Sequence, residues 1–577
     1  MEIFMYQKAL AFFTKLYNNR DEAKYFGARP MKPKLPTHTP VKYPFPRATP
    51  ESVGIRREHI YAFIKELSEM TELAPHLLTI TKDNQIISET EFYPYRMDTW
   101  HVSHSLCKSI TAIAVGLAVE DGVLSLDEKI TDIFAKHAFS IDFVRQKDIT
   151  IRHLLNMSAG IAFNELGSVT YEDWTEGFFA SNLKFAPGTK FFYNSMNSYI
   201  LSAAIKEKTG RDMFDLLYER VFLPMGITEV CWEKSPTGIT KGGWGMYMKM
   251  EDMLKFGKLF LDEGVWEDER LISAEWIAEM TKKQTVTPES MNQHGYGYHV
   301  WMGARQGSYQ FNGMFGQNLF VFPDIRMTIG IYSGGTEFFP TGKLTSLVNQ
   351  YFGDHYTPAE EELRPSRHAY GALRSLNATL ALPKPQTKQE KIQKCAALMP
   401  IINKSFCIDG KNVGLLPVTL SLLHANFTGG IEKISFRLLG DIVEATFDSP
   451  IETITIPFSV NGTAHYFDLN ENGERFSAAS IGKMTKNEDD VPVFKLTVYF
   501  LETTAVRHIK IFFHREKTLV RFSEEPTGSA LLETFSPVLG DFVPDNRALK
   551  NLLAKTENTM LYELVDKLFT LQFTVKK

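Results

Sequence analysis

The residues best suited to chemistry are Ser105 and Lys108, which form a Ser-x-x-Lys tetrad at the start of an apolar, helix-like run. A serine hydroxyl is a poor nucleophile until a neighbouring base takes its proton. Positions i and i+3 share one face of a helix, so this spacing places the Lys108 amine one turn from the Ser105 hydroxyl. The start of a helix also favours a developing anion. The tetrad therefore predicts a nucleophilic serine paired with a lysine, although two polar residues on a helix face give the same pattern.

A second segment with chemical potential runs from the Pro-Gly-Thr turn at residues 187–189 into Tyr193. The residues after Tyr193 are typical of a helix, so its phenol can be presented to the serine–lysine pair. A nearby lysine cation is expected to lower the pKa of this phenol, which makes Tyr193 a candidate proton shuttle. Further along, Gly313 and Gly316 stand on either side of Met314-Phe315, just before a predicted strand. Glycine at these positions lets a backbone edge approach a substrate closely.

The bulk composition excludes several classes of partner. The chain has 577 residues, 44% hydrophobic and 23% charged, which is typical of a globular protein with two or three domains. Its net charge of −5 gives no electrostatic reason to expect nucleic acid or an anionic membrane. No apolar run reaches the roughly 18 residues that a membrane span needs, and the N-terminal segment lacks the features of a signal peptide. We therefore expect a cytoplasmic protein with no membrane or nucleic-acid partner.

The remaining reactive residues give no second constellation. The four cysteines are widely separated and form no Cys-x-x-Cys pair, which indicates reduced thiols. No His-Glu-x-x-His, EF-hand or Walker pattern occurs, so we expect no metal and no cofactor. His101 and His104 lie close to Ser105, but position i−1 does not face position i on a helix, so a structural role is favoured. His294 and His299 flank a Gly-Tyr-Gly-Tyr turn, and the sequence leaves open whether either lines a cleft or lies at the surface.

Composition shifts divide the chain into four segments. Strand-like and helix-like stretches mix in the second, with hairpins expected around Asp83-Asn84 and Pro323-Asp324, which predicts an α/β (α+β) domain with an antiparallel sheet flanked by helices. The last segment alternates β-branched and aromatic residues, which predicts an all-β barrel or sandwich, with a helix over residues 544–571. The segments are an N-terminal helix and Pro-rich strap (1–47), the α/β domain (48–355), a linker (356–390) and the β-rich domain (391–577).

Several segments of the α/β domain, taken in order, resemble the class C β-lactamase and penicillin-binding-protein superfamily of serine hydrolases. Its family-VIII-type esterase and 6-aminohexanoate-oligomer hydrolase branches look closest. The resemblance spans roughly residues 48–340 and implies a β-lactamase-like fold. The segments that carry it are WHVSHSLCKSITAIAVGLAVEDGVLSLDEKI, HLLNMSAGI, PGTKFFYNS, LPMGI, GGWGMYM, GYGYHVW and GMFGQ.

The resemblance also implies roles for individual residues. It assigns Ser105 as the nucleophile, Lys108 as its hydrogen-bonded base partner and Tyr193 as the second general base and acid. It also implies that the backbone N–H groups of Ser105 and Met314 form an oxyanion hole.

This sequence departs from the family pattern at two places. The usual middle motif is Tyr-x-Asn, whereas here Asn194 directly follows the tyrosine, so either Asn194 or Ser195 fills the substrate-facing role. Phe311 stands where the lactamases place the lysine of a Lys-Thr-Gly motif, and the literal Lys-Thr-Gly at 208–210 ends a helix instead. The residues expected to contact substrate are Asn194, Ser195, Phe311, Asn312, Gly313 and Gln317.

The sequence thus predicts a serine hydrolase that forms an acyl-enzyme on Ser105 and cleaves a small ester or amide. One alternative is a β-lactamase or D-Ala peptidase, which the missing lysine at Phe311 and the lack of an export signal disfavour. Another is a catalytically inactive binding protein on the same fold, which the intact Ser105, Lys108 and Tyr193 disfavour.

Overall fold

The computed structural model describes residues 2–18, 41–137, 141–168, 171–337, 339, 342–427, 429–528 and 567–576. The chain forms two compact units: unit 1 comprises Met1–Met5 and Pro36–Ala381, and unit 2 comprises Tyr6–Leu35 and Leu382–Lys577. Most of the helix predicted over residues 544–571 lies outside the described residues.

Unit 1 is built on a six-stranded antiparallel sheet with the order β2-β1-β11-β10-β9-β8. Asp83 and Asn84 both have positive φ in the turn between β1 and β2, and Pro323-Asp324 turns the chain between β10 and β11. Both predicted hairpins are therefore confirmed. The strands are β1 (Pro75–Lys82), β2 (Gln85–Glu91), β8 (Trp301–Met302), β9 (Tyr309–Gly313), β10 (Gln317–Phe322) and β11 (Met327–Ser333).

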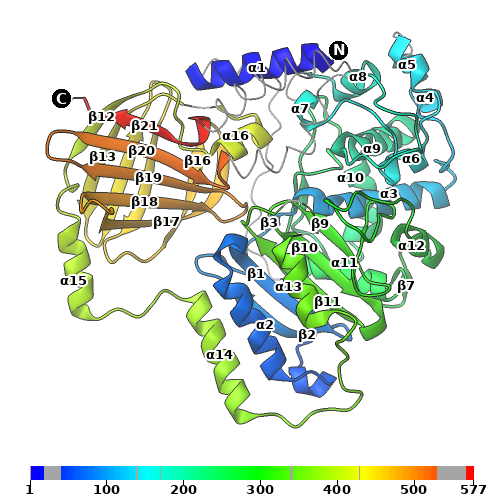
Figure 1. Ribbon diagram of the computed structural model, residues 1–577, viewed down its shortest axis with the longest axis horizontal. Coiled ribbons are helices and arrows are strands. Elements are labelled where there is room, and N and C mark those ends of the chain that lie inside the picture. Colours follow the sequence, from blue (N-terminus) through cyan, green and yellow to red (C-terminus); the bar gives the residue numbers. More distant parts are fainter. Residues whose placement is uncertain are drawn as a thin grey trace. The chain divides into compact units, whose positions relative to one another are not determined.

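Helices cover both faces of this sheet, as predicted (Figure 1). On one face, Ile329 and Ile331 of β11 share an apolar core with α2 (Arg57–Glu69) and α13 (Lys343–Phe352). Successive residues of a strand face opposite sides, and Gly330 accordingly lies against Met250 of α11 (Met250–Leu261) on the other face. Helix α3 (Cys107–Glu120), which contains Lys108, also contacts β9.

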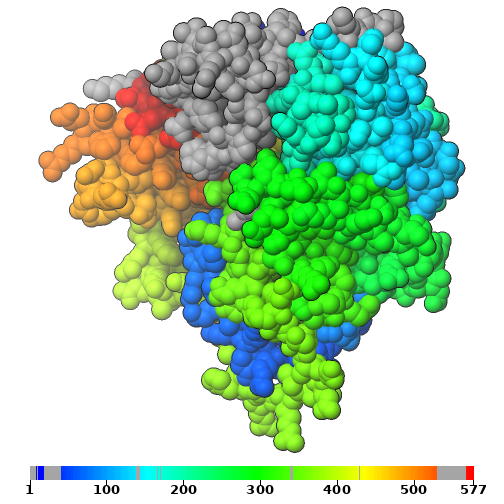
Figure 2. All heavy atoms as spheres, turned by 45° about the vertical axis from the view of Figure 1, so that its right-hand side comes forward, coloured from blue at the N-terminus to red at the C-terminus, as the bar shows by residue number. Residues whose placement is uncertain are grey.

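Smaller elements complete unit 1, and in the space-filling view the helical and sheet parts form one continuous body (Figure 2). A three-stranded sheet with the order β3-β5-β4 consists of β3 (His101–Val102), β5 (Met246–Met248) and β4 (Cys231–Trp232), and β6 (Val265–Trp266) pairs with β7 (Glu269–Arg270). The further helices are α4 (Ile130–Ile133), α5 (Ile141–Arg145), α6 (Ile151–Leu155), α7 (Glu165–Ser168), α8 (Trp174–Phe179), α9 (Ser195–Thr209), α10 (Met213–Leu217) and α12 (Ala274–Thr281).

The segment predicted to be a linker is largely ordered structure. Helix α14 (Arg367–Ala381) packs against α2, and its Leu380 carbonyl accepts the Tyr93 N–H at 2.8 Å. Leu373 is buried in the same apolar core as α2. The hydrophilic composition of this segment reflects a helix with one narrow buried stripe, so unit 1 ends near Ala381 and not near residue 355.

Unit 2 contains the predicted β-rich region. Its strands form two antiparallel sheets, β12-β13-β14-β15 and β16-β17-β18-β19-β20-β21, whose buried side chains belong to one apolar core. Helices α15 (Lys388–Ala397) and α16 (Val418–His424) also lie in this unit. The strands are β12 (Ser405–Gly410), β13 (Ile431–Leu439), β14 (Ile442–Asp448), β15 (Thr453–Ser459), β16 (His465–Glu471), β17 (Glu474–Lys486), β18 (Pro492–Phe500), β19 (Val506–Phe513), β20 (Thr518–Glu525) and β21 (Leu571–Thr574).

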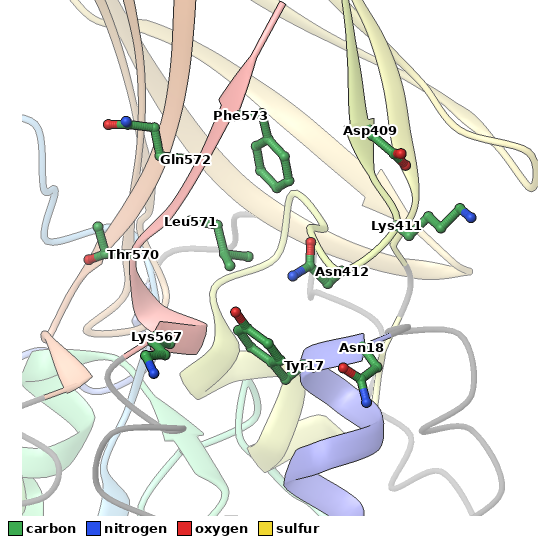
Figure 3. A pocket seen from close by; sticks show the side chains of 10 residues that line it. All are labelled: Tyr17, Asn18, Asp409, Lys411, Asn412, Lys567, Thr570, Leu571, Gln572 and Phe573. Carbon is green, nitrogen blue, oxygen red and sulfur yellow. The ribbon is translucent and has the colours of Figure 1, made fainter. Parts of the chain in front are cut away.

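A cavity of about 460 Å³ lies in unit 2, between the end of α1 (Glu2–Asn18) and strands β12 and β21 (Figure 3). Its lining mixes Tyr17, Leu571 and Phe573 with polar and charged side chains from these elements and from the residues beside them. Ser105 belongs to unit 1, so this cavity is not lined by the predicted catalytic residues.

A buried ion pair lies within the six-stranded sheet of unit 2, and its carboxylate also binds the start of α16. Arg507 and Glu524 have side chains 1% and 0% exposed, with Nη1 and Oε2 3.0 Å apart. Glu524 also accepts the N–H groups of Val418 and Thr419 at the start of α16. Both charges are therefore desolvated, and each depends on the other.

Glu524→Gln is expected to lower the free energy of unfolding by about 3–5 kcal/mol, because the buried Arg507 charge would lose its ion-pair partner. The matched control is Asp468→Asn, which removes an acid from a half-exposed pair with Arg475 and should cost less than about 1 kcal/mol. Urea unfolding of the full-length chain measures both. Equal losses for the two variants would contradict this assignment.

Candidate active site

The segment that contains Ser105 is held between the short strand β3 and helix α3. Ser103 donates its N–H to the Met246 carbonyl of β5 at 2.8 Å, which fixes the end of β3. A 3-10 turn, His104–Leu106, then leads into α3. His104 has a φ of +47°, which is uncommon for a residue with a side chain and stores backbone strain directly before Ser105. Ser105 itself is half-buried in this turn.

The Lys108 amine lies 2.8 Å from Ser105 Oγ, to which it donates a hydrogen bond. Its other acceptors are Ser195 Oγ at 2.9 Å and the Gly243 carbonyl at 2.7 Å. The side chain is 1% exposed, and burial lowers the pKa of Lys108 to about 8. A lysine in this state exchanges its proton close to neutral pH, which is what a general base requires.

Tyr193 joins the same cluster, but the predicted effect on its pKa is wrong. Its ring centroid lies 4.9 Å from Lys108 Nζ, and Ser105 acts to lower the pKa of its phenol. Burial among Trp301, Tyr296 and Phe339 outweighs this contact and raises the pKa of Tyr193. The phenol is therefore protonated at neutral pH and available as a hydrogen-bond donor.

The residues after Tyr193 divide two tasks between them. Asn194 is the N-cap of α9: its Oδ1 accepts the Met196 N–H at 2.9 Å, and its amide donates to the carbonyls of Ile161 and Phe163. This side chain is fully buried and occupied by the protein. Ser195, the first residue of α9, is the one that reaches Lys108.

The edge of the six-stranded sheet closes on the nucleophile turn at Gly313. A Cβ on this residue would lie 2.3 Å from the Ser103 carbonyl, so only glycine permits this approach. Met314 follows and is half-buried. Within the described part of the chain, neither the Ser105 N–H nor the Met314 N–H donates a hydrogen bond to the protein.

Gln317 does not face the cleft as predicted. Its amide donates to the carbonyls of Met314, Phe315 and Ser333 at 2.7–3.2 Å, and its side chain is 0% exposed. Gln317 therefore holds the β9–β10 turn in shape, and the prediction that it contacts substrate is wrong.

Phe311 and Asn312 are also committed to the protein. Phe311 is 0% exposed, and its ring lies 4.9 Å from that of Phe260 in α11. Asn312 is buried and donates to Asn318 Oδ1 on the neighbouring strand at 2.8 Å. The predicted substrate contacts of these side chains are thus replaced by core packing and a cross-strand pair.

Two residues near Lys108 were not predicted from the sequence. Gly243 supplies a carbonyl to Lys108 from the glycine-rich segment before β5, and the repeated glycines there are the signal that could have identified it. Glu165 accepts the Ser195 N–H at 2.9 Å, and no spacing rule connects it to the serine–lysine pair.

The histidines have structural partners. His101 lies 3.0 Å from His76 in the interior, and His104 is 1% exposed against Phe315. His299 is 2% exposed, and its Nε2 lies 2.9 Å from Ser198 Oγ. Burial, followed by the Lys108 charge, lowers the pKa of His299 to about 3, so this ring is neutral at physiological pH.

The described residues contain no cluster of three or more potential metal ligands. None of their helices combines the length and the apolar character needed to cross a membrane.

Comparison with known proteins finds similarity in unit 1. Residues 62–346, slightly less than half of the chain, match the family model described as Beta-lactamase. This part of the chain is therefore similar to the beta-lactamase family. The beta-lactamase match begins within α2 and ends within α13, so it covers most of unit 1 and none of the described residues of unit 2.

The individual relatives are distant. The 6-aminohexanoate-dimer hydrolase of Paenarthrobacter ureafaciens is 20% identical over 305 residues, covering 48% of this chain and 77% of that protein. The lovastatin esterase of Penicillium rubens is 27% identical over 165 residues, covering 24% of this chain and 41% of that protein. A solved structure, the putative 6-aminohexanoate-dimer hydrolase from Bacillus anthracis, is 17% identical with a TM-score of 0.43, covering 62% of this chain and 91% of that one.

Replacing the buried lysine should change how stability depends on pH. Between about pH 8 and 10.5, folded Lys108 has lost its proton while the unfolded chain still binds one. Stability of the wild type should therefore rise with pH across this window, by up to about 3 kcal/mol. Lys108→Met should lack this rise.

Other groups also titrate between about pH 8 and 10.5. The unfolding free energy of the variant is therefore subtracted from that of the wild type at each pH, and the difference is compared across this range. Lys282→Met, at a side chain 65% exposed, is the control and should leave the pH dependence unchanged. A rise of equal size in Lys108→Met would contradict the depressed lysine pKa.

Proposed function

We propose that this protein is a serine hydrolase that forms an acyl-enzyme on Ser105 and cleaves a small ester or amide. The observation that carries the proposal is the 2.8 Å hydrogen bond from the buried Lys108 amine to the Ser105 hydroxyl. A lysine with a pKa of about 8 is partly neutral at physiological pH, whereas an ordinary lysine is almost wholly protonated.

In the acylation step, Ser105 Oγ attacks the carbonyl carbon while its proton passes to neutral Lys108. The sequence left Lys108 and Tyr193 as alternative bases. The raised pKa of Tyr193 favours Lys108, since a protonated phenol cannot accept another proton. Tyr193 then gives its proton to the leaving oxygen or nitrogen and regains one from Lys108, so that the lysine returns to its neutral form.

The developing oxyanion would accept hydrogen bonds from the backbone N–H groups of Ser105 and Met314. Two observations support this assignment: neither N–H has an acceptor within the described chain, and Gly313 brings the strand edge against the Ser105 turn. Donors fixed in place before the reaction stabilise such a charge efficiently, because nothing has to reorganise. Water then attacks the acyl-enzyme, and its proton passes through Tyr193 to Lys108. As the bond between the acyl carbon and Ser105 Oγ breaks, Lys108 returns a proton to Oγ, which restores the serine hydroxyl and the neutral lysine.

A small ester or amide is favoured over a β-lactam or a D-Ala peptide. The resemblance implies that lactamases place a lysine at the position of Phe311, and here that side chain is an apolar core residue. The two named relatives, an amide-dimer hydrolase and an esterase, agree with an acyl-transfer reaction on other substrates.

Ser105→Ala is expected to abolish labelling by a fluorophosphonate probe and to lower kcat/KM for p-nitrophenyl acetate by at least about a thousandfold. The lost hydroxyl is the atom to which the acyl group is transferred. Ser125→Ala, at an exposed serine beyond α3, is the control and should retain full labelling. Labelling that persists in Ser105→Ala would assign the nucleophile to another residue.

The pH profile tests the base. For a neutral ester, kcat/KM should rise with pH and level off above about pH 8, as Lys108 loses its proton. Lys108→Arg should be inactive at every pH, because a guanidinium stays protonated. A wild-type profile that is flat between pH 6 and 9 would argue against Lys108 as the base.

A further inference from the structure

Glu165 places a carboxylate beside the nucleophile cluster. Its Oε1 accepts the Ser195 N–H at 2.9 Å, and the Ser195 hydroxyl in turn lies 2.9 Å from Lys108 Nζ. Glu165 is half-buried at the start of α7. Among the described residues, no lysine, arginine or histidine forms an ion pair with it, so its charge acts on whatever occupies the site.

The other titratable groups around Lys108 add little net charge. Tyr193 and Cys107 are buried with raised pKa values, and His299 is buried with a lowered pKa, so all three are neutral near pH 7. Glu233 is paired with Lys241 in the interior. Glu165 and the titrating Lys108 are therefore the charges that a bound substrate meets at this point.

The charge of Glu165 changes the pKa values of Lys108 and Tyr193 in a definite direction. The carboxylate acts to raise the pKa of Lys108, which opposes the effect of burial on that residue. It also acts to raise the pKa of Tyr193, which adds to the effect of burial there. Geometry links the carboxylate to the same cluster, because Ser195 contacts Glu165 through its N–H and Lys108 through its hydroxyl, each at 2.9 Å. A like charge on a substrate bound near this carboxylate is costly.

We propose that Glu165 is a specificity-determining residue that makes the Ser105 site select neutral or cationic esters and amides over those carrying a carboxylate. This inference rests on the proposed hydrolase function. Two features then disfavour an anionic substrate: the Glu165 carboxylate repels it, and β9 carries Phe311 where a cation could have held it. Discrimination of this kind commonly relies on such unfavourable charge contacts.

The structural and electrostatic roles of Glu165 can be separated. A carboxylate at the start of a helix stabilises it by accepting an N–H and by its charge. Glu165→Gln keeps an oxygen for the Ser195 N–H and removes only the charge. Glu172→Gln makes the same chemical change at an exposed site seven residues further on and is the matched control.

The test uses three phenyl acetates that share the acetyl group and differ at the para position: a carboxylate, its methyl ester and a trimethylammonium group. The ratio of kcat/KM for the anionic to the neutral ester is compared between variants, so that differences in intrinsic reactivity cancel. Glu165→Gln should raise this ratio by at least about fivefold and lower the ratio for the cationic ester. Glu172→Gln should change neither.

A ratio unchanged in Glu165→Gln, with all three esters slowed equally, would reduce Glu165 to a structural role and overturn the proposal. The wild type supplies a second measurement if the variant does not fold: raising the salt concentration should increase the anionic-to-neutral ratio, because ions screen the repulsion. A wild type that neither hydrolyses the neutral ester nor labels at Ser105 would instead refute the proposed function itself.

Discussion

A single buried amine sets the requirements that the rest of unit 1 meets. Lys108 is 1% exposed, and an ammonium or amine without partners in the interior carries a large desolvation cost. Three acceptors from separate parts of the chain offset it: Ser105 from the turn before α3, Ser195 from α9 and Gly243 from the segment before β5. The cost that remains lowers the pKa of Lys108 to about 8, so the incomplete compensation leaves this amine partly neutral near physiological pH.

The segment that supplies Gly243 shows how the fold brings such acceptors within reach. A Cβ on Gly243 would lie 2.8 Å from the Ser195 carbonyl, so a side chain there would push the segment away from α9. The segment is closed by a buried pair, Lys241 and Glu233, whose side chains are 1% and 2% exposed. The Gly243 carbonyl thus reaches the lysine because glycine permits the approach and an ion pair fixes the loop.

The sequence predicted the parts of this arrangement that follow from local periodicity. Spacing of i and i+3 brings Lys108 to Ser105, and turn residues such as Asp83-Asn84 locate the hairpins of the main sheet. The β-rich character of unit 2 follows in the same way from alternating strands. Composition predicted a linker where the structure has α14. This helix is polar over most of its surface, yet a narrow apolar face that includes Leu373 packs against α2.

Other features depend on balances that spacing does not contain. A lysine cation beside Tyr193 favours a lowered pKa, but burial among aromatic rings is the larger effect and reverses the sign. The choice between Asn194 and Ser195 turns on one residue of helix register, because the N-cap amide is consumed by the helix start. Glu165 approaches the site through a backbone N–H of α9, a contact that only the folded chain defines.

The β9–β10 turn illustrates how hydrogen bonds within the protein can leave one backbone N–H without an acceptor in the described chain. Around the β9–β10 turn, the Phe315 N–H donates to the Glu337 carbonyl, and the Gln317 amide takes the carbonyls of Met314 and Phe315. These bonds use up the neighbouring backbone groups and hold the turn rigid. The Met314 N–H is left without an acceptor in the described chain, beside a glycine that touches the Ser105 turn. A backbone N–H that is left unpaired at such a point keeps its full hydrogen-bonding capacity for a developing charge. Gln317 therefore serves this edge better from behind the turn, where it binds the neighbouring carbonyls, than from within the cleft.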